Sequence, residues 1–186
     1  GQVKRARVDM GPACLESKQV PVDLPEERVV GRQTEVAGGV YEITCVSMGN
    51  PHCVVFGGDP CRLDLEKIGP AFERAPLFPQ QVNTEFVQVL DNRTLRMRVW
   101  ERGSGETWAC GTGACAAAVA AVLGGLCPKG QDIRVCLRDG AVQKQNSRTA
   151  HQGASEKNTV CIRCRKFLMG VGMFIEVMTA TGFAVW

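Results

Sequence analysis

Residues 110–123 read CGTGACAAAVAAVL, a run of small and apolar side chains that contains no proline. Alanine-rich sequence of this kind favours an α-helix, and Gly124-Gly125 predicts where the helix ends. A helix that is apolar on every side must be buried on every side. The composition therefore suits a helix that is buried within the fold.

The sequence before the helix predicts a β-hairpin. Phe86–Leu90 forms one strand, Asp91-Asn92 a turn and Thr94–Trp100 a second strand. Side chains alternate along the second strand, which is typical of a strand with one buried face. The face expected to be buried consists of Leu95, Met97 and Val99, and the opposite face of Arg96, Arg98 and Trp100. A glycine-rich loop, Glu101–Glu106, joins the hairpin to the helix.

Two further strands and a short helix are expected upstream. Val40–Val46 is a strand that a turn at Met48–Pro51 ends, and Cys53–Phe56 is a short buried strand. Asp64 is placed to cap a helix that Gly69-Pro70 interrupts. The apolar face of that helix consists of Leu65, Ile68 and Phe72.

The composition is that of a globular protein. The chain has 186 residues, of which 45% are hydrophobic and 22% charged, and these values exclude a disordered or collagen-like chain. No apolar run approaches the ~20 residues that a membrane helix needs, so we expect no membrane partner. Residues 1–10 lack the apolar core of a secretory signal. The first residue is not Met, which indicates that the chain begins partway into a longer protein.

Charge and polarity divide the chain. From Lys144 to Lys166 basic side chains outnumber acidic ones six to one, which gives +5 within a net charge of +3, so the remainder carries −2. Because the body is not basic, we expect no nucleic-acid partner. We predict a body at 1–140, a polar and basic insertion or linker at 141–173, and closing strands of the same domain at 174–186. The strands expected there are Phe174–Met178 and Gly182–Trp186.

The chain contains ten cysteines. Without a secretory signal, reduced thiols in a cytoplasmic protein are the expected interpretation, most of them small buried residues. Cys161 and Cys164 form a Cys-x-x-Cys pair, but a zinc site needs a second pair of ligands. We therefore expect no metal.

Cys110 is the candidate reactive residue. It precedes the predicted helix, whose N-terminus presents unpaired N–H groups and a partial positive charge. Both favour a thiolate, so the pKa of this thiol is expected to fall. The same N–H groups could hold a substrate carboxylate, which suits a base that removes the α-proton of an amino or hydroxy acid. Spacing alone also fits a simpler structure, a glycine-rich turn capped by a buried cysteine.

Four segments together carry a family resemblance. They are ERGSGETWACGTGAC at Glu101–Cys115, MGNPHCVVF at Met48–Phe56, VNTEFV at Val82–Val87 and VDMG at Val8–Gly11. The first closely resembles the second catalytic segment of diaminopimelate epimerases, and the others match further stretches of that family in the same order. The resemblance covers roughly residues 1–137.

The resemblance implies a fold and a reaction. The fold is a mixed α/β half-domain, a strongly curved, barrel-like sheet around a central helix, here Thr112 to Leu123. The reaction is the interconversion of LL- and meso-2,6-diaminopimelate in bacterial lysine and peptidoglycan precursor synthesis. It needs no cofactor and no metal, because two cysteines face each other across the substrate α-carbon. Cys110 matches one of them.

The same resemblance assigns roles to further residues. Gly111 and Thr112 match positions whose backbone N–H groups hold the reacting carboxylate. The positions that grip the rest of the substrate correspond to Asn50, Asn83, Glu101 and Arg102, and those that tune the thiols to His52 and Glu101. Taken singly, each side chain also fits a structural role, as a turn residue, a residue bonding its own backbone or half of a surface ion pair.

The chain departs from the family in one important respect. The family has two similar halves, and the thiol of the first lies in a Cys-Gly-Asn-Gly-like segment, whereas the only Cys-Gly here is Cys110-Gly111. We therefore expect a C-terminal half whose first half is missing. A single thiol can remove a proton from one face of the α-carbon but cannot deliver one to the other. The chain alone is thus predicted to be an incomplete epimerase, and a homodimer is possible.

Two other interpretations stay open. The same fold serves proline racemases and phenazine-pathway isomerases, which act on other substrates, although Asn83 and Glu101-Arg102 favour a doubly charged one. Alternatively the chain is a non-catalytic remnant or binding module whose basic segment contacts an acidic partner.

Overall fold

The computed structural model describes residues 6–137, 160–165 and 174–179. Its elements, in chain order, are β1 (Ala6–Asp9), β2 (Arg32–Val36), β3 (Gly39–Ser47), β4 (Pro51–Phe56), the 3₁₀ turn η1 (Pro60–Arg62), α1 (Leu65–Glu73), β5 (Asn83–Asp91), β6 (Thr94–Glu101), β7 (Gly105–Thr107), α2 (Gly111–Leu123), β8 (Ile133–Leu137), β9 (Val160–Arg165) and β10 (Phe174–Thr179). They form a 10-stranded sheet in the order β1-β10-β9-β8-β6-β5-β4-β3-β2, with β7 paired to β6.

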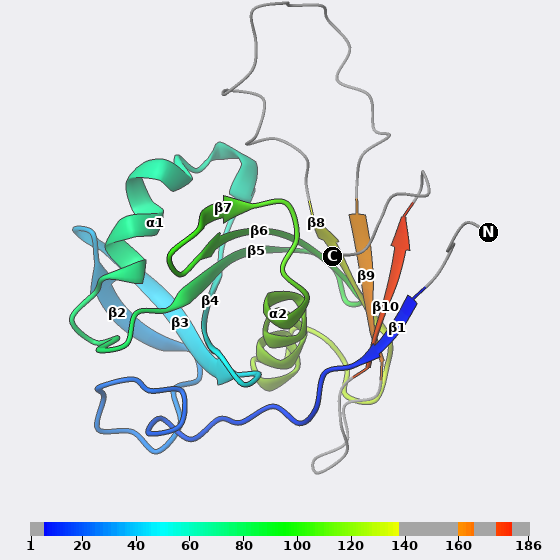
Figure 1. Cartoon of the computed structure of the whole chain (residues 1–186), viewed down its shortest axis with the longest axis horizontal. Helices are drawn as coiled ribbons and strands as arrows, with labels where there is room; N and C mark the ends of the chain where they lie inside the picture. The colour runs from blue at the N-terminus through cyan, green and yellow to red at the C-terminus, as the bar shows by residue number, and fades with distance from the viewer. Residues whose placement is uncertain (1–5, 138–159, 166–173, 180–186) are drawn as a thin grey trace, which may run out of the picture.

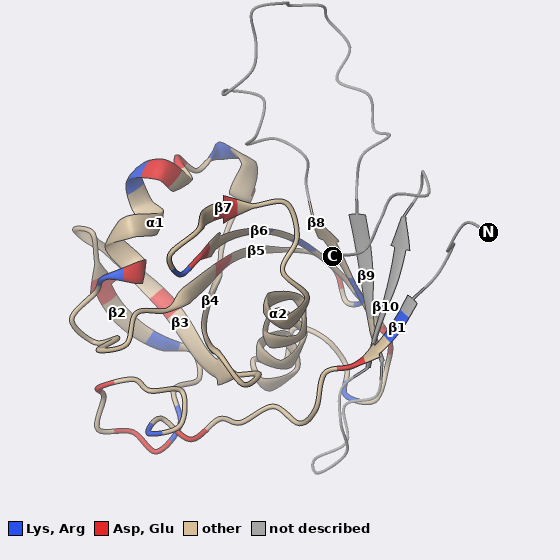
Figure 2. Ribbon diagram, viewed as in Figure 1, with Lys and Arg blue, Asp and Glu red and all other residues tan. Residues whose placement is uncertain are grey.

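The sheet curves around α2, which lies at the centre of Figure 1. The helix contacts β3, β4, β5, β6, β8 and β9, and its residues from Gly113 to Ala121 are buried. Figure 2 shows no charged side chain on α2, whereas α1 carries both signs. The expected mixed α/β fold, with a curved sheet around this helix, is confirmed. In the described chain the sheet ends at β1 and β2, so it is an open sheet rather than a closed barrel.

Each face of the sheet has its own core. On the inner face Val54, Val87 and Val99 pack with the alanines of α2. On the outer face Phe72 of α1 packs edge-to-face against Phe86 of β5. The predicted hairpin is confirmed as β5 and β6, which pair antiparallel. Its expected buried face, Leu95, Met97 and Val99, is 1% exposed or less.

The short helix α1 differs from the expectation in two ways. It runs through Gly69-Pro70 without a break, and Asp64 occupies the N-cap position without a side-chain hydrogen bond. Gly69 allows α1 to pack closely on the sheet, because a Cβ at this position would overlap the Trp100 ring of β6. Pro70 removes only the bond to the carbonyl of Glu66, an exposed residue.

The C-terminal part adds two strands to the sheet. β10 confirms the strand expected at Phe174–Met178, and it pairs with β1 and β9. β9 was not predicted, although it lies inside the segment 141–173 interpreted as an insertion or linker; it pairs with β8. The strand expected at Gly182–Trp186 lies outside the described residues. Of the helices in the described chain, none is long and apolar enough to cross a membrane.

Candidate active site

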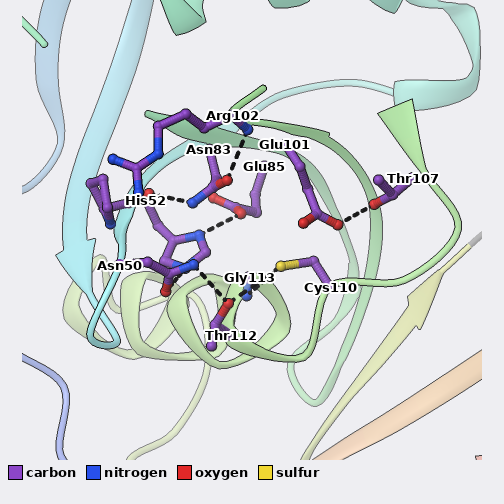
Figure 3. A network of polar contacts seen from close by, with 11 residues as sticks. Asn50, His52, Asn83, Glu85, Glu101, Arg102, Thr107, Cys110, Thr112 and Gly113 are labelled. Carbon is purple, nitrogen blue, oxygen red and sulfur yellow. Dashed lines mark hydrogen bonds and ion pairs between the residues drawn. The ribbon is translucent and has the colours of Figure 1, made fainter. Parts of the chain in front are cut away.

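The polar residues of the inner face gather where the sheet meets the N-terminus of α2 (Figure 3). β4 and β5 run parallel, with His52 beside Asn83 and Val54 beside Glu85. β6 runs antiparallel to β5, with Val99 beside Glu85, so its final residue Glu101 reaches the same end of the sheet. Side chains alternate along strands, and this places the side chains of His52, Asn83, Glu85 and Glu101 on one face. Further along, the inner face becomes apolar.

Cys110 is the N-cap residue of α2. Its Sγ accepts the backbone N–H of Gly113 at 3.2 Å and lies 3.3 Å from Thr112 Oγ1. The N–H groups of Gly111 and Thr112 belong to the same first turn, where a helix makes no internal bonds with them. The N-terminal position predicted for this thiol is therefore confirmed.

The predicted fall in the pKa of Cys110 is wrong. Burial raises the pKa of this thiol to about 12, and the neighbouring carboxyl groups of Glu85 and Glu101 add to the rise when they are ionised. The hydrogen bonds from Thr112 and Gly113 lower it, but by less. The helix end acts in the expected direction, yet the thiol is only 7% exposed. Desolvation of the thiolate therefore outweighs the helix N-terminus.

His52 and Glu85 form a completely buried pair. The Nδ1 atom of His52 lies 2.7 Å from Glu85 Oε1, and both side chains are 0% exposed. His52 Nε2 lies 2.9 Å from Asn50 Oδ1, and the Asn50 amide donates to Thr112 Oγ1 at 3.3 Å. Burial raises the pKa of Glu85 above its ordinary value, although His52 opposes the shift. The other carboxyl oxygen of Glu85, Oε2, is buried without a hydrogen-bond partner.

Gly113 makes room for this pair. A Cβ at this position would lie 2.5 Å from Glu85 Oε1 and 3.2 Å from Cys110 Sγ. Since real Cβ atoms do not approach neighbours so closely, only glycine allows the helix to approach Glu85 here. Glu85 and Cys110 therefore belong to one site, on opposite sides of Gly113.

Asn83 and Arg102 are held mainly by backbone groups. The Asn83 amide donates to the Pro51 carbonyl at 2.7 Å and accepts the Arg102 N–H at 2.9 Å. The Arg102 guanidinium donates to the Gln80 carbonyl at 3.0 Å and is exposed. Asn83 thus joins the start of β4 to the end of β6, and the guanidinium contacts Gln80 rather than Cys110.

Hydrogen bonds to β7 and α1 hold Glu101 and the loop that follows it. Its carboxylate accepts a hydrogen bond from the Thr107 hydroxyl of β7. Glu73 of α1 accepts Trp100 Nε1–H at 2.7 Å and the Gly103 N–H at 2.9 Å, and so ties the loop to the helix. The pKa of Glu73 is lowered although burial opposes this, because both of these donors stabilise its carboxylate.

Sequence reasoning missed Glu85 as a site residue. The available signal was its position: Asn83, Glu85 and Val87 share one face of a strand, and an acidic residue inside the otherwise buried run Thr84–Val87 is unusual. The described residues contain no group of three or more His, Cys, Asp or Glu side chains that could hold a metal ion. Cys164 of the suspected Cys-x-x-Cys pair is buried, and its thiol lies 3.6 Å from the Ala114 carbonyl of α2.

Comparison with known proteins places the chain in a family. The family model described as diaminopimelate epimerase matches residues 44–160. The chain belongs to the diaminopimelate epimerase family. A diaminopimelate epimerase from Pelotomaculum thermopropionicum is 51% identical over 140 residues, 75% of this chain and 49% of the relative. One from Desulfitobacterium hafniense is 57% identical over 124 residues, 67% of this chain and 44% of the relative.

The family resemblance inferred from the four sequence segments is therefore confirmed. The chain spans about half the length of the curated relatives it matches. Among solved structures, a predicted epimerase from Pseudomonas aeruginosa has a TM-score of 0.49 and 14% identity, over 96% of this chain and 56% of that one. That likeness is too weak to assign a function.

Proposed function

We propose that this chain is the part of a diaminopimelate epimerase that carries one of its two acid–base thiols, Cys110. The observation that supports this most directly is the position of Cys110, a thiol at the N-terminus of α2 beside the unbonded N–H groups of Gly111 and Thr112. These groups are suited to a carboxylate, and a carboxylate bound there holds its own α-carbon next to the sulfur.

In the proposed step the Cys110 thiolate takes the α-proton of the substrate and becomes a thiol. The C–H electron pair remains on the substrate and delocalises into the carboxylate, where the N–H groups of Gly111 and Thr112 stabilise the added charge. A second thiol then donates its proton to the opposite face of the carbon. One proton is lost and one gained, no cofactor or metal takes part, and the two sulfurs exchange roles.

We place the second thiol in the half of the relatives that this chain does not match. The substrate also changes the state of Cys110: an amino acid brings an α-ammonium group, and a positive charge near the sulfur favours the thiolate that burial disfavours. Asn50, Asn83, Glu101 and Arg102 are proposed to bind the substrate, Arg102 after exchanging Gln80 for a carboxylate. His52 and Glu101 are proposed to tune the thiol.

The test combines the full 186-residue chain with the separately expressed N-terminal half of the Pelotomaculum relative. We expect interconversion of LL- and meso-diaminopimelate only when both are present, and none with Cys110→Ala. Rapid interconversion by this chain alone would contradict the one-thiol proposal. No activity from the mixture, despite a complex visible on gel filtration, would contradict the assignment of the substrate and favour a related amino-acid isomerase or a non-catalytic protein.

A further inference from the structure

A continuous series of hydrogen bonds joins the buried Glu85 to the reactive sulfur (Figure 3). From Glu85 Oε1 it passes to His52, from there to Asn50, then to the Thr112 hydroxyl and finally to Cys110 Sγ. Its members come from β5, from β4 and the turn before it, and from the N-terminus of α2. At one end lies a carboxyl group that is 0% exposed, and at the other a thiol.

The chemistry of each group gives this series a direction. Asn50 Oδ1 can only accept, so His52 Nε2 must carry a proton and donate it. The Asn50 amide then donates to Thr112 Oγ1. Because Thr112 accepts from Asn50, its own hydrogen is free to point at Cys110 Sγ. Every hydrogen bond after His52 therefore points toward the sulfur, the orientation that stabilises a thiolate.

The first bond of the series requires a proton on one of its two atoms. With Nε2 protonated, a neutral His52 has a bare Nδ1 that needs a donor, and the atom 2.7 Å away is Glu85 Oε1. The second oxygen, Oε2, is buried with no donor. An ionised carboxylate with an unsatisfied buried oxygen is far more costly than a neutral carboxylic acid whose carbonyl oxygen is unsatisfied.

The charges around Glu85 lead to the same protonation state. The titratable groups that act on it are His52 and Cys53 of β4, Glu101 of β6 and Cys110 of α2. Only His52 among them can become a cation. A negative Glu85 would add its charge to that of Glu101 at the place where Cys110 must become a thiolate. Consistently, the pKa of Glu85 is raised by burial.

We propose that Glu85 is a positioning residue that acts as a neutral carboxylic acid: it donates its proton to His52 Nδ1 and so fixes the direction of the hydrogen bonds that end on Cys110 Sγ. If the Glu85–His52 pair loses this proton to solvent, the proton that remains on His52 moves to Nδ1, beside the Glu85 carboxylate, and Nε2 becomes an acceptor. The Asn50 amide then turns over, the Thr112 hydroxyl follows its oxygen, and the sulfur loses a donor. This inference rests on the proposed function for its catalytic meaning, but its test needs no turnover.

The first measurement uses the unaltered chain labelled with ¹⁵N-histidine. The chain has two histidines, so a spectrum of His151→Gln assigns the signals of His52. We expect Nε2 to carry a proton and Nδ1 to be an unprotonated hydrogen-bond acceptor at pH 7. A protonated Nδ1 at pH 7 would overturn the proposal.

The second measurement follows the alkylation of Cys110 by iodoacetamide between pH 8 and pH 10, quantified on the peptide that contains it. Glu85→Gln replaces the acid O–H by an amide N–H donor, so its rate should remain within about twofold of the unaltered chain. Glu85→Leu removes the donor and should slow the alkylation. Thr112→Val should slow it too, by roughly tenfold, because it removes a hydrogen bond to a charged sulfur. Thr112→Ser should keep the rate.

Glu106→Leu is the matched control, because Glu106 is another largely buried carboxylate but pairs with Arg98. Glu106→Leu should not change how the alkylation rate of Cys110 depends on pH. A Glu85→Gln variant that folds, as judged by circular dichroism, yet loses Cys110 reactivity would show that the carboxylate charge is required and would refute the proposal. If Glu85→Leu does not fold, the histidine spectrum and Glu85→Gln still decide. Failure of the two-half epimerase assay, with these results as expected, would count against the proposed function alone.

Discussion

Replacement of Gly113 by alanine tests whether α2 approaches Glu85 closely. The sign of the change in the free energy of unfolding distinguishes a close contact from open space. Gly113 lies in the first turn of α2, and in a helix alanine is favoured over glycine by about 1 kcal/mol. If the space around Gly113 were open, the variant would therefore be more stable. The structure instead places the new methyl 2.5 Å from Glu85 Oε1 and 3.2 Å from Cys110 Sγ, in a completely buried region.

Overpacking of a well-packed core costs typically about 1–3 kcal/mol. Neither Glu85 nor Cys110 can move away easily, because the first is bound to His52 and the second is held by the N–H of Gly113 itself. Taking about 3 kcal/mol for the clash and subtracting the gain in helix propensity leaves a net loss of about 2 kcal/mol. For a chain of this size that corresponds to a fall in Tm of about 4–8 °C.

The assay is urea unfolding followed by circular dichroism, with Gly57→Ala as control. A Cβ at Gly57 would meet no atom within 4 Å, so that variant should unfold within about 0.5 kcal/mol of the unaltered chain. An increase in stability for Gly113→Ala would refute the close approach of α2 to Glu85 and, with it, the contact between the two parts of the site.

Further predictions concern the support of the site and its thiols. Trp100→Phe removes the indole donor to Glu73 and should cost about 1.5–3 kcal/mol, the range for a hydrogen bond to a charged group, in urea unfolding; an unchanged midpoint would contradict it. Arg98→Lys replaces a guanidinium that binds a carboxylate through two nitrogens and should cost about 1–2 kcal/mol, whereas an equal stability would show that charge alone suffices. The pKa of the buried Cys53 thiol is raised above the ordinary 9.0 by burial and by Cys45, and that of Cys164 by its hydrogen bond with Cys115 and by burial, so above pH 9 both ionise only on unfolding. Stability should be full below pH 9 and fall above it, and Cys164→Ala should reduce the slope by about 1.4 kcal/mol per pH unit; the same slope in both proteins would refute this.

Local patterns accounted for most of the predicted fold. The alternation in Thr94–Trp100 and the uniform apolar character of α2 depend on residues close in sequence, and both were confirmed. The missed strand, β9, shows the limit. In Val160–Arg165 two cysteines and two arginines fill four of the six positions, so the residue types do not single out a strand, and its place between β8 and β10 depends on pairing with distant strands.

For the candidate site, the sequence predicted which residues to examine but not how they contact one another. The motif around Cys110 and the family resemblance indicated nearly all the residues that gather at the N-terminus of α2. They did not indicate that Asn83 connects Pro51 to Arg102, because those partners are distant in sequence. They also did not indicate Glu85, whose partner His52 lies in a different strand.

The sequence by itself determined where the helix begins, which residue caps it and which faces of the strands are apolar, because these follow from residue type and short-range periodicity. The tertiary structure alone decided the chemical state of the thiol. A helix N-terminus favours a thiolate, but burial beneath the sheet raises the pKa of Cys110 instead. Desolvation and charge at a site depend on every segment that surrounds it, and here those segments come from β4, β5, β6 and α2 together.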